Sequence, residues 1–274
     1  MGRRDLIGTV VFLMAVMSSP GAFAHAQQIV TLSTRPGVTQ SYFFARVQQE
    51  PLAIAVLFPG SGGLINLRSE NGQIKFGGEN FLVRSRVEFV KRGVIAAIVD
   101  APSDQQSGWG MTDEFRFSEQ HFTDMAAVVG DLSKRFAGMP LFLVGTSRGT
   151  VSAAVLAVRF GQPVAGVILT STVFRATGRN STEPGPELSK FDFATIKIPL
   201  LFAHHVSDQC AATPYADAQR LSDKYPLISV LGGLSPKSGP CDPFNYHGYY
   251  GKESDTIEEI VNWMMKKPFR DVVK

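Results

Sequence analysis

The chain has 274 residues, of which 44% are hydrophobic and 19% are charged, and its formal net charge is +3. This length suits one α/β domain whose core is large enough to contain a pocket. The weak charge balance, with no run of Lys or Arg interleaved with aromatic residues, excludes nucleic acid as an expected partner. Composition therefore indicates a packed globular protein and gives no oligomeric state.

The segment 1–26 is typical of an export leader. An arginine pair precedes an apolar run over residues 6–17, and small residues close the segment. The run is shorter than the roughly 20 residues that a membrane-spanning helix needs, so we expect no stable membrane insertion once the leader is cleaved. Cleavage is expected after Ala26, with Ala24 as the second choice. The protein is then exported, periplasmic or secreted, by either the Sec or the Tat route.

The chain contains two cysteines, Cys210 and Cys241. An even pair in an oxidising compartment is expected to form a disulfide, and two buried free thiols are the alternative. No metal site is expected, because no second Cys or His stands at zinc-ligand spacing around either residue. The bond would tie together the loops that carry Asp208 and His247.

Short, continuously apolar runs recur along the chain, as expected for strands of a parallel sheet that is covered on both faces. They are residues 52–58, 94–99, 141–144, 164–169, 200–203 and 228–231. Before them, the alternating segments 29–33 and 41–47 predict edge strands on either side of a turn at Pro36-Gly37.

Helix-like segments separate these strands. They are residues 79–92, 115–136, 148–160, 213–224 and 254–266. The alternation of strands and helices predicts a doubly wound α/β sheet, formed by a single domain over residues 27–274. A stretch rich in Gly, Pro and Ser, residues 177–189, is expected to make a short excursion over the top of the sheet.

The segment Gly145-Thr146-Ser147-Arg148-Gly149 matches the pattern G-x-S-x-G. It lies between a predicted strand and a predicted helix, which is the context that this pattern requires. The glycines leave room for a sharp turn with a strained backbone, and the helix N-terminus places a positive dipole end where negative charge develops. Ser147 is therefore the candidate nucleophile.

A glycine-rich loop at residues 59–63 follows an early strand. Such a loop supplies backbone N–H groups to an oxyanion hole, so we expect Ser61 or Gly62 as one donor and Arg148 as the other. A phosphate-binding loop is excluded, because no Gly-Lys-Ser/Thr ending follows and Ile65 occupies the third glycine position of a dinucleotide fingerprint. An ordinary glycine-rich turn is the remaining alternative.

Asp208 follows the predicted strand 200–203, where a carboxylate can orient a catalytic base. Two other carboxylates, Asp217 and Asp223, fall on the next predicted helix and are expected to face solvent. Asp100 precedes the candidate serine in the chain and suits a role in loop structure. Asp208 is therefore the candidate acid.

Four histidines lie beyond the leader: His121, His204, His205 and His247. Only His247 follows Asp208, which completes the chain order Ser, Asp, His. Imidazole titrates near neutral pH and suits taking a proton from a serine and returning it to a leaving group. His204 and His205 are expected to pack beside the site, and His121 is expected to be exposed on a helix.

Together these motifs resemble the α/β-hydrolase superfamily over residues 29–266, and within it small secreted bacterial hydrolases of the dienelactone hydrolase and esterase type. The resemblance implies an eight-stranded, mostly parallel sheet, with the triad on loops at the carboxyl ends of the strands. Two features depart from the common pattern. Pro59 stands where many members have His, and the excursion at 177–189 is shorter than a typical lid.

The resulting hypothesis is a serine hydrolase that cleaves a small ester-type substrate through an acyl-enzyme on Ser147, without a metal or organic cofactor. A peptidase or thioesterase with the same triad is one alternative, and a non-catalytic binding protein on the same fold is another. Arg148 is expected to point away along the helix and form an ion pair on the surface rather than bind an acidic substrate. Trp109 either overhangs the pocket as an aromatic wall or simply packs.

Overall fold

A computed structural model describes residues 26–175 and 188–274. The expected leader, apart from Ala26, and most of the excursion at 177–189 lie outside these residues. The elements run in the order β1 (Ala26–Arg35), β2 (Val38–Arg46), β3 (Ala53–Phe58), β4 (Arg68–Glu70), β5 (Gln73–Lys75), α1 (Phe81–Arg84), α2 (Arg86–Lys91), β6 (Val94–Val99), α3 (Asp113–Phe117), α4 (Glu119–Arg135), β7 (Leu141–Thr146), α5 (Gly149–Phe160), β8 (Gly166–Thr170), β9 (Leu200–His205), α6 (Tyr215–Gln219), β10 (Leu227–Val230), α7 (Glu253–Met264) and β11 (Val272–Val273).

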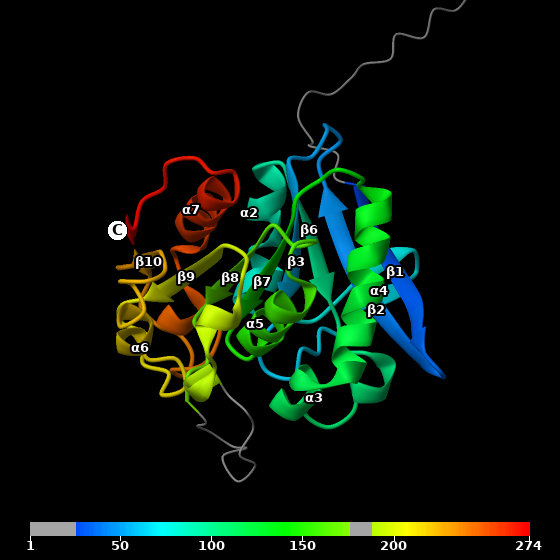
Figure 1. The fold of residues 1–274 in the computed structure, drawn as a ribbon, viewed down its shortest axis with the longest axis horizontal. Coiled ribbons are helices and arrows are strands. Elements are labelled where there is room, and N and C mark those ends of the chain that lie inside the picture. Colours follow the sequence, from blue (N-terminus) through cyan, green and yellow to red (C-terminus); the bar gives the residue numbers. More distant parts are fainter. Residues whose placement is uncertain (1–25, 176–187) are drawn as a thin grey trace, which may run out of the picture.

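The described residues form a nine-stranded sheet in the order β1-β2-β6-β3-β7-β8-β9-β10-β11, and β4 and β5 form a separate hairpin (Figure 1). In the nine-stranded sheet, strand β2 is antiparallel to both β1 and β6, and the other neighbouring strands are parallel. The predicted mostly parallel α/β sheet is confirmed, with the two-residue β11 added to the eight expected strands. The parallel strands β3, β7 and β9 end at one edge, where ligands bind in sheets of this kind.

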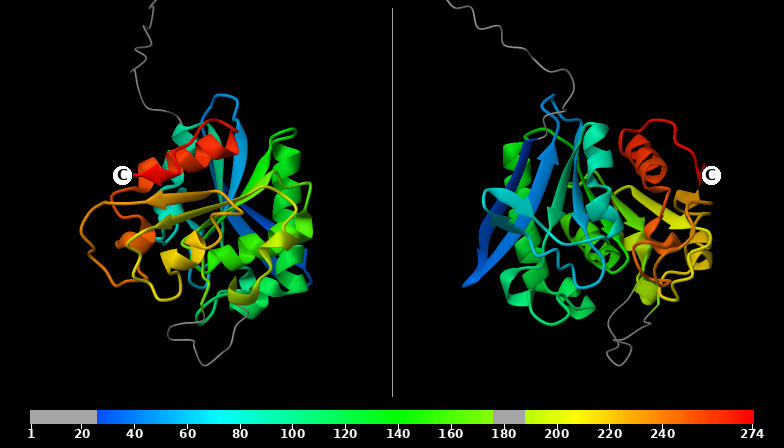
Figure 2. Two further views of the ribbon diagram at one scale, coloured as in Figure 1. Left: turned by 60° about the vertical axis from the view of Figure 1, so that its left-hand side comes forward. Right: turned by 180° about the vertical axis from the view of Figure 1, so that it is seen from behind.

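Helices cover both faces of the sheet (Figures 1 and 2). Helix α4 packs on β1 and β2, and α5 packs on β3, β7 and β8. On the other face α2 packs on β6, and α7 packs on β10. Each layer has its own apolar cluster, with Leu132 of α4 in one and Ile260 of α7 in the other, both fully buried. Burying one such side chain stabilises the fold by about 1.5–3 kcal/mol.

Two predicted helices are interrupted by serines. The segment 79–92 is divided at Ser85 into α1 and α2, and 115–136 is divided at Ser118 into α3 and α4. Ser118 has an extended backbone, and its hydroxyl accepts a hydrogen bond from the N–H of His121 at 3.2 Å. Serine favours such N-cap positions because its side chain satisfies an unpaired N–H, which apolar periodicity does not reveal. The helix predicted at 213–224 is also shorter, since α6 has only five residues.

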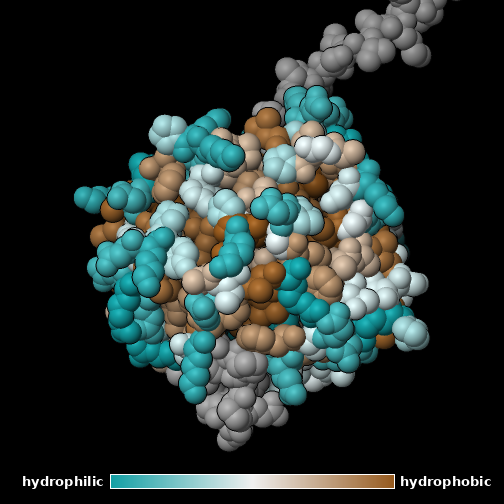
Figure 3. Space-filling view, in the orientation of Figure 1, coloured by the Kyte–Doolittle hydropathy of each residue, from teal (hydrophilic) through white to brown (hydrophobic). Residues whose placement is uncertain are grey.

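Polar side chains cover much of the face shown in Figure 3, with apolar residues between them. Across residues 26–175 and 188–274, no helix has the length and apolar character to cross a membrane.

Candidate active site

Ser147 sits on the sharp turn between β7 and α5, in the left-handed region with φ of 51°. Its N–H donates to the carbonyl of Thr170 at 3.1 Å. The two motif glycines are required by backbone contact. A Cβ on Gly149 would lie 2.0 Å from the carbonyl oxygen of Phe58, and one on Gly145 would lie 2.5 Å from that of Gly149. The turn therefore packs tightly against the end of β3, which brings Ser147 beside the glycine-rich loop.

That loop lies against the serine. A Cβ on Gly60 would lie 2.9 Å from the Cβ of Ser147. Ser61 follows in the left-handed region with φ of 50° and lines the same cavity as Ser147. The backbone N–H groups of Ser61 and Arg148 have no acceptor among the described residues. Both are therefore free to donate to an oxygen bound at Ser147.

Gly62, the alternative donor, is packed against a neighbouring segment. A Cβ there would lie 1.7 Å from the carbonyl oxygen of Trp109, and its own carbonyl accepts from the N–H of Met111 at 2.9 Å. It is not among the residues that line the cavity. Trp109 does not line the cavity either, and its side chain is 70% exposed. Ser61 thus fits the donor role better than Gly62, and the prediction of an aromatic wall has no support.

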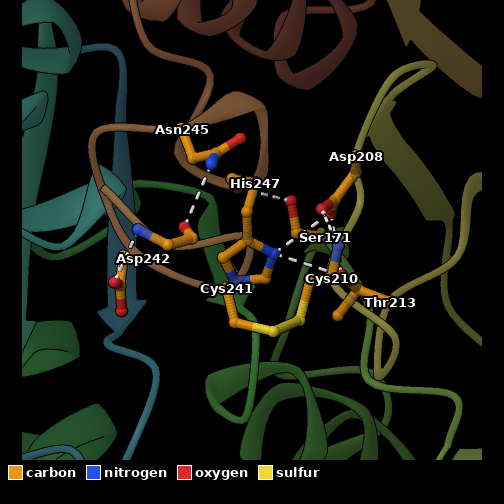
Figure 4. Close-up of a disulfide and its surroundings, with 9 residues drawn as sticks. Ser171, Asp208, Cys210, Thr213, Cys241, Asp242, Asn245 and His247 are labelled. Carbon is orange, nitrogen blue, oxygen red and sulfur yellow. Dashed lines mark hydrogen bonds and ion pairs between the residues drawn. A yellow bond between two sulfur atoms is a disulfide. The ribbon is translucent and has the colours of Figure 1, made fainter. Parts of the chain in front are cut away.

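Asp208 follows β9, and its carboxylate meets the imidazole of His247 (Figure 4). Oδ2 of Asp208 lies 3.0 Å from Nδ1 of His247. The hydroxyl of Thr213 donates to the same Oδ2 at 2.8 Å and lies 3.1 Å from the same Nδ1. Both side chains are buried, and this shields their interaction from solvent. The arrangement leaves Nε2 of His247 as the ring nitrogen free for chemistry.

His247 lies in a short 3-10 turn, Tyr246–Gly248. Asn245 caps this turn, because its side-chain oxygen accepts from the N–H of Tyr246 at 2.7 Å. A Cβ on Gly248 would lie 2.0 Å from the carbonyl oxygen of Pro243, so only glycine fits after the histidine. The carbonyl of His247 accepts from the hydroxyl of Ser171 at 2.8 Å, which anchors the turn to the end of β8.

The predicted disulfide joins Cys210 and Cys241. Figure 4 shows that it lies beneath the His247 ring and connects the Asp208 loop with the loop before His247. The N–H of Cys210 donates to Oδ1 of Asp208 at 2.9 Å. Cys210 is buried and Cys241 is exposed and lines the cavity. The disulfide therefore joins a residue that bonds the carboxylate of Asp208 to a residue of the cavity wall.

A cavity of about 250 Å³ contains both Ser147 and His247 in its lining. The two side chains are not hydrogen-bonded to each other here, although catalytic hydrogen bonds are often long before substrate binds. The rest of the lining comes from the glycine-rich loop, the segment before α1 and the loop after Cys241. It consists of Pro59, Gly60, Ser61, Leu64, Ile65, Gly78, Glu79, Asn80, Phe81, Thr146, Cys241, Asp242, Pro243 and Gly248.

The family described as serine aminopeptidase, S33, matches residues 89–228, about half of the chain. The chain belongs to this family of α/β-hydrolases. The resemblance drawn from the motifs is thereby confirmed at the level of the superfamily. No curated protein gives a significant match.

Solved structures share the fold at low sequence identity. Est1E from Butyrivibrio proteoclasticus is 14% identical with a TM-score of 0.59, and the match covers 87% of this chain and 99% of that one. An α/β serine hydrolase homologue from Coxiella burnetii is 13% identical with a TM-score of 0.54, covering 87% and 96%. An S-formylglutathione hydrolase from Agrobacterium tumefaciens is 11% identical with a TM-score of 0.58, covering 93% and 99%.

In this α/β-hydrolase His204 and His205 are the last two residues of β9, and both bond backbone groups near the site. Nε2 of His204 accepts from the N–H of Thr172 at 2.9 Å, and burial lowers the pKa of His204 to about 4. His205 donates to the carbonyl of Gly232 and stacks on Tyr246, with ring centroids 4.6 Å apart. Neither histidine lines the cavity. Both therefore pack beside the site, as expected.

The prediction that His121 is exposed is wrong. Its side chain is fully buried, and burial together with the nearby charge of Arg116 lowers its pKa to about 3. The break at Ser118 turns α3 back against the first turn of α4, so that Phe115 covers the imidazole with ring centroids 5.7 Å apart.

Asp100 has the structural role expected of it. Its buried carboxylate accepts from the N–H groups of Ile65 and Leu67, each at 2.8 Å, and so fixes the chain beyond the glycine-rich loop. Asp217 is only partly exposed and pairs with Arg175 at 2.8 Å. Neither carboxylate lines the cavity.

Arg148 points away from the cavity, as expected, and forms an ion pair with Asp113 at the start of α3. Asp113 is buried, so this is not the surface pair that was anticipated. Sequence reasoning missed Asp113, Arg116 and Thr213. No motif marks these three residues, and Asp113 lies before the helix that was predicted over 115–136.

Among the residues that the structure describes, no three His, Cys, Asp or Glu side chains gather in a way that would hold a metal ion.

Proposed function

We propose that this α/β-hydrolase cleaves carboxylic esters through an acyl-enzyme on Ser147. The proposal depends on one observation: the segments that contain Ser147, Asp208 and His247 lie close together although they are far apart in the sequence. Oδ2 of Asp208 lies 3.0 Å from Nδ1 of His247, and His247 shares a cavity with Ser147. In the proposed roles Ser147 attacks the carbonyl carbon, His247 takes its proton, and Asp208 orients the imidazole and stabilises the imidazolium.

The oxyanion of the tetrahedral intermediate would be held by the N–H groups of Ser61 and Arg148. Both are unpaired among the described residues and flank the serine. Helix α5 is 12 residues long and begins at Gly149, so its positive dipole end lies beside the developing charge. Fixed donors of this kind need no reorganisation during the reaction, which is why they lower the barrier. His247 would then pass its proton to the leaving alcohol, and water would complete the cycle.

The cavity favours a small acyl group. Its volume of about 250 Å³ lies below the roughly 300–1,000 Å³ that is common for drug-sized ligands. Leu64, Ile65 and Phe81 supply apolar lining near the serine. We therefore infer a preference for short-chain esters over long acyl chains.

The test compares wild type with Ser147→Ala and with Ser222→Ala, a surface control whose hydroxyl bonds only the carbonyl of Gln219. We expect Ser147→Ala to lower kcat/KM for p-nitrophenyl acetate by about 10⁴-fold or more, and Ser222→Ala to leave it unchanged. A fluorophosphonate probe should label the peptide that contains Ser147 in wild type and in the control only. Equal hydrolysis by Ser147→Ala, or labelling of another serine, would overturn the proposal.

Cleavage of an amino-terminal residue is the second candidate, because the matching family is described as serine aminopeptidase. Glu79 and Asp242 line the cavity and would attract a substrate ammonium group. Esters, thioesters and amides use the same triad, so only substrates separate these activities. Measuring kcat/KM for p-nitrophenyl esters, thioesters and aminoacyl p-nitroanilides shows which substrate class is preferred. Faster turnover of the anilides would favour the peptidase.

We also propose that residues 27–274 act as one exported domain, in the periplasm or outside the cell. Two features support export: the leader-like segment 1–26 and the Cys210–Cys241 disulfide, which persists in oxidising compartments. Cell fractionation and mass spectrometry of the mature N-terminus test this proposal. Recovery of the intact chain from the cytoplasm would contradict it.

A further inference from the structure

The glycine-rich loop is docked on a segment that includes no triad residue. The carbonyl of Gly62 accepts from the N–H of Met111 at 2.9 Å, and a Cβ on Gly110 would lie 2.5 Å from that carbonyl oxygen. One residue earlier, the carbonyl of Ser61 accepts from the guanidinium of Arg116 at 2.8 Å. Two consecutive peptide groups of the loop are thus held by residues 110–116.

Arg116 lies in α3 and is among the largest fully buried side chains of the described chain. One guanidinium nitrogen binds the carbonyl of Ser61, and the other donates to the hydroxyl of Ser152 in α5 at 2.6 Å. Burial lowers the pKa of Arg116 to about 10, so the side chain remains a cation at neutral pH. A buried charge is costly unless it is well paired. Two nitrogens of this guanidinium bond the proposed oxyanion loop and helix α5, while Nε has no partner among the described residues.

The same short helix also holds the second proposed oxyanion donor. Asp113 is the first residue of α3, and its buried carboxylate pairs with the guanidinium of Arg148. Arg148 supplies the other proposed N–H. Helix α3 therefore contacts both sides of the proposed oxyanion hole, through Arg116 on the loop and through Asp113 on the elbow.

The conformation of Ser61 explains why such an anchor is needed. A left-handed backbone is sparsely populated by residues other than glycine, and it persists only where the surroundings impose it. Because the N–H and the carbonyl of one residue share the same Cα, holding the carbonyl of Ser61 also limits where its N–H points. The contact from Arg116 thus bears directly on the direction of that donor.

We propose that Arg116 is a positioning residue that preorganises the oxyanion hole through the carbonyl of Ser61, while Asp113 pairs with the side chain of Arg148 on the other side. This proposal depends on the proposed hydrolase function. Neither side chain lines the cavity. The effect of Arg116 falls on the transition state, because only there does an oxyanion form to be bound by the two N–H groups.

The experiment compares wild type, Arg116→Met, Arg116→Lys and Leu132→Ala with p-nitrophenyl acetate as substrate and phenylboronic acid as transition-state analogue. Leu132→Ala is the matched control, since it opens the core beneath α4 and destabilises the fold without touching the site. Thermal unfolding establishes that each variant is folded at the assay temperature. We expect Arg116→Met to lower kcat/KM by about 100-fold, as for loss of one oxyanion donor, and to raise the Ki of the boronic acid in parallel.

Arg116→Lys keeps the charge but not the two-pronged contact, so we expect about a tenfold loss with the same parallel rise in Ki. Leu132→Ala should lower only the unfolding temperature. The inference is overturned if folded Arg116→Met stays within about threefold of wild type in kcat/KM, or if the Ki of the boronic acid does not rise with the loss. If Arg116→Met does not fold, the same criteria apply to Arg116→Lys.

The Ser147→Ala variant separates the two proposals. If wild type is active, Ser147→Ala is inactive and the Arg116 variants retain full activity, the hydrolase proposal stands and the positioning proposal fails. If Ser147→Ala is as active as wild type, the hydrolase proposal itself fails.

Discussion

Oδ2 of Asp208 lies 3.0 Å from Nδ1 of His247, although the two residues are 39 positions apart in the chain. Neighbouring groups hold both partners. Thr213 and the N–H of Cys210 donate to the carboxylate, and Ser171 donates to the carbonyl of His247. The proposed acid and the proposed base are therefore held in place by their neighbours, as efficient proton transfer requires.

The hydroxyl of Thr213 is expected to support this pair. Thr213→Val removes the 2.8 Å hydrogen bond to Asp208 while keeping the shape of the side chain. We expect kcat for ester hydrolysis to fall by about tenfold, since the lost bond is worth roughly 1–2 kcal/mol beside a charged group. Thr123→Val is the control, because its hydroxyl bonds the carbonyl of Glu119 within α4, away from the cavity. Steady-state kinetics of both variants test the expectation, and equal kcat in all three proteins would contradict it.

The disulfide is expected to contribute both stability and activity. Its two cysteines are 31 positions apart, and closing a loop of that size stabilises the fold by about 3–4 kcal/mol in the chain-entropy model. We expect the Cys210→Ser/Cys241→Ser double variant to unfold at lower urea concentration and to hydrolyse esters more slowly, because the loop that orients Asp208 is released. Dithiothreitol should reproduce both effects in wild type and change nothing further in the variant. A wild type that is indifferent to reduction would rule this role out.

Two glycines, one in α5 and one in α4, should respond to alanine in opposite directions. Gly149→Ala places a Cβ 2.0 Å from the carbonyl oxygen of Phe58, so we expect a loss of at least about 2 kcal/mol in the free energy of unfolding together with loss of activity. Gly130→Ala, in the middle of α4, places its Cβ in open space. It should stabilise the fold by about 0.5–1 kcal/mol. Urea unfolding of both variants measures the difference, and similar effects would be inconsistent with the elbow geometry.

His204 should make the fold less stable in acid. Burial holds its pKa at about 4 in the folded state, against about 6.5 in an unfolded chain. Between these values the unfolded chain binds a proton that the folded protein does not. The part of the folding stability that depends on neutral His204 is therefore fully present above about pH 6.5 and is lost as the pH falls towards 4.

The variant His204→Gln keeps an acceptor for Thr172 but does not titrate. We expect the difference in the free energy of unfolding between wild type and variant to change by about 3 kcal/mol between pH 7 and pH 4, in favour of the variant at low pH. Urea unfolding at pH 7, 5.5 and 4 measures this difference. A difference that is constant with pH would show that His204 is not the group responsible.

Much of the architecture follows from local pattern. The buried strands were visible because side chains covered on both faces are mostly apolar, and β3, β6, β7 and β9 are buried throughout. The motif around Ser147 was visible because a tight backbone turn admits only glycine at fixed positions. The helix breaks at Ser85 and Ser118 were not visible, because apolar periodicity continues across both serines. Whether the helix ends there depends on a single capping interaction or turn.

By itself, the sequence determined the fold class, the nucleophile motif and the chain order of the candidate triad, since each depends on residue type at short spacing. Only the tertiary structure decided that Ser61 rather than Gly62 faces the cavity, that His121 is buried, and that α3 holds the glycine-rich loop. These outcomes depend on which surfaces meet when distant segments pack. Arg116 and Ser61 are 55 positions apart, and no local pattern encodes a contact over that separation.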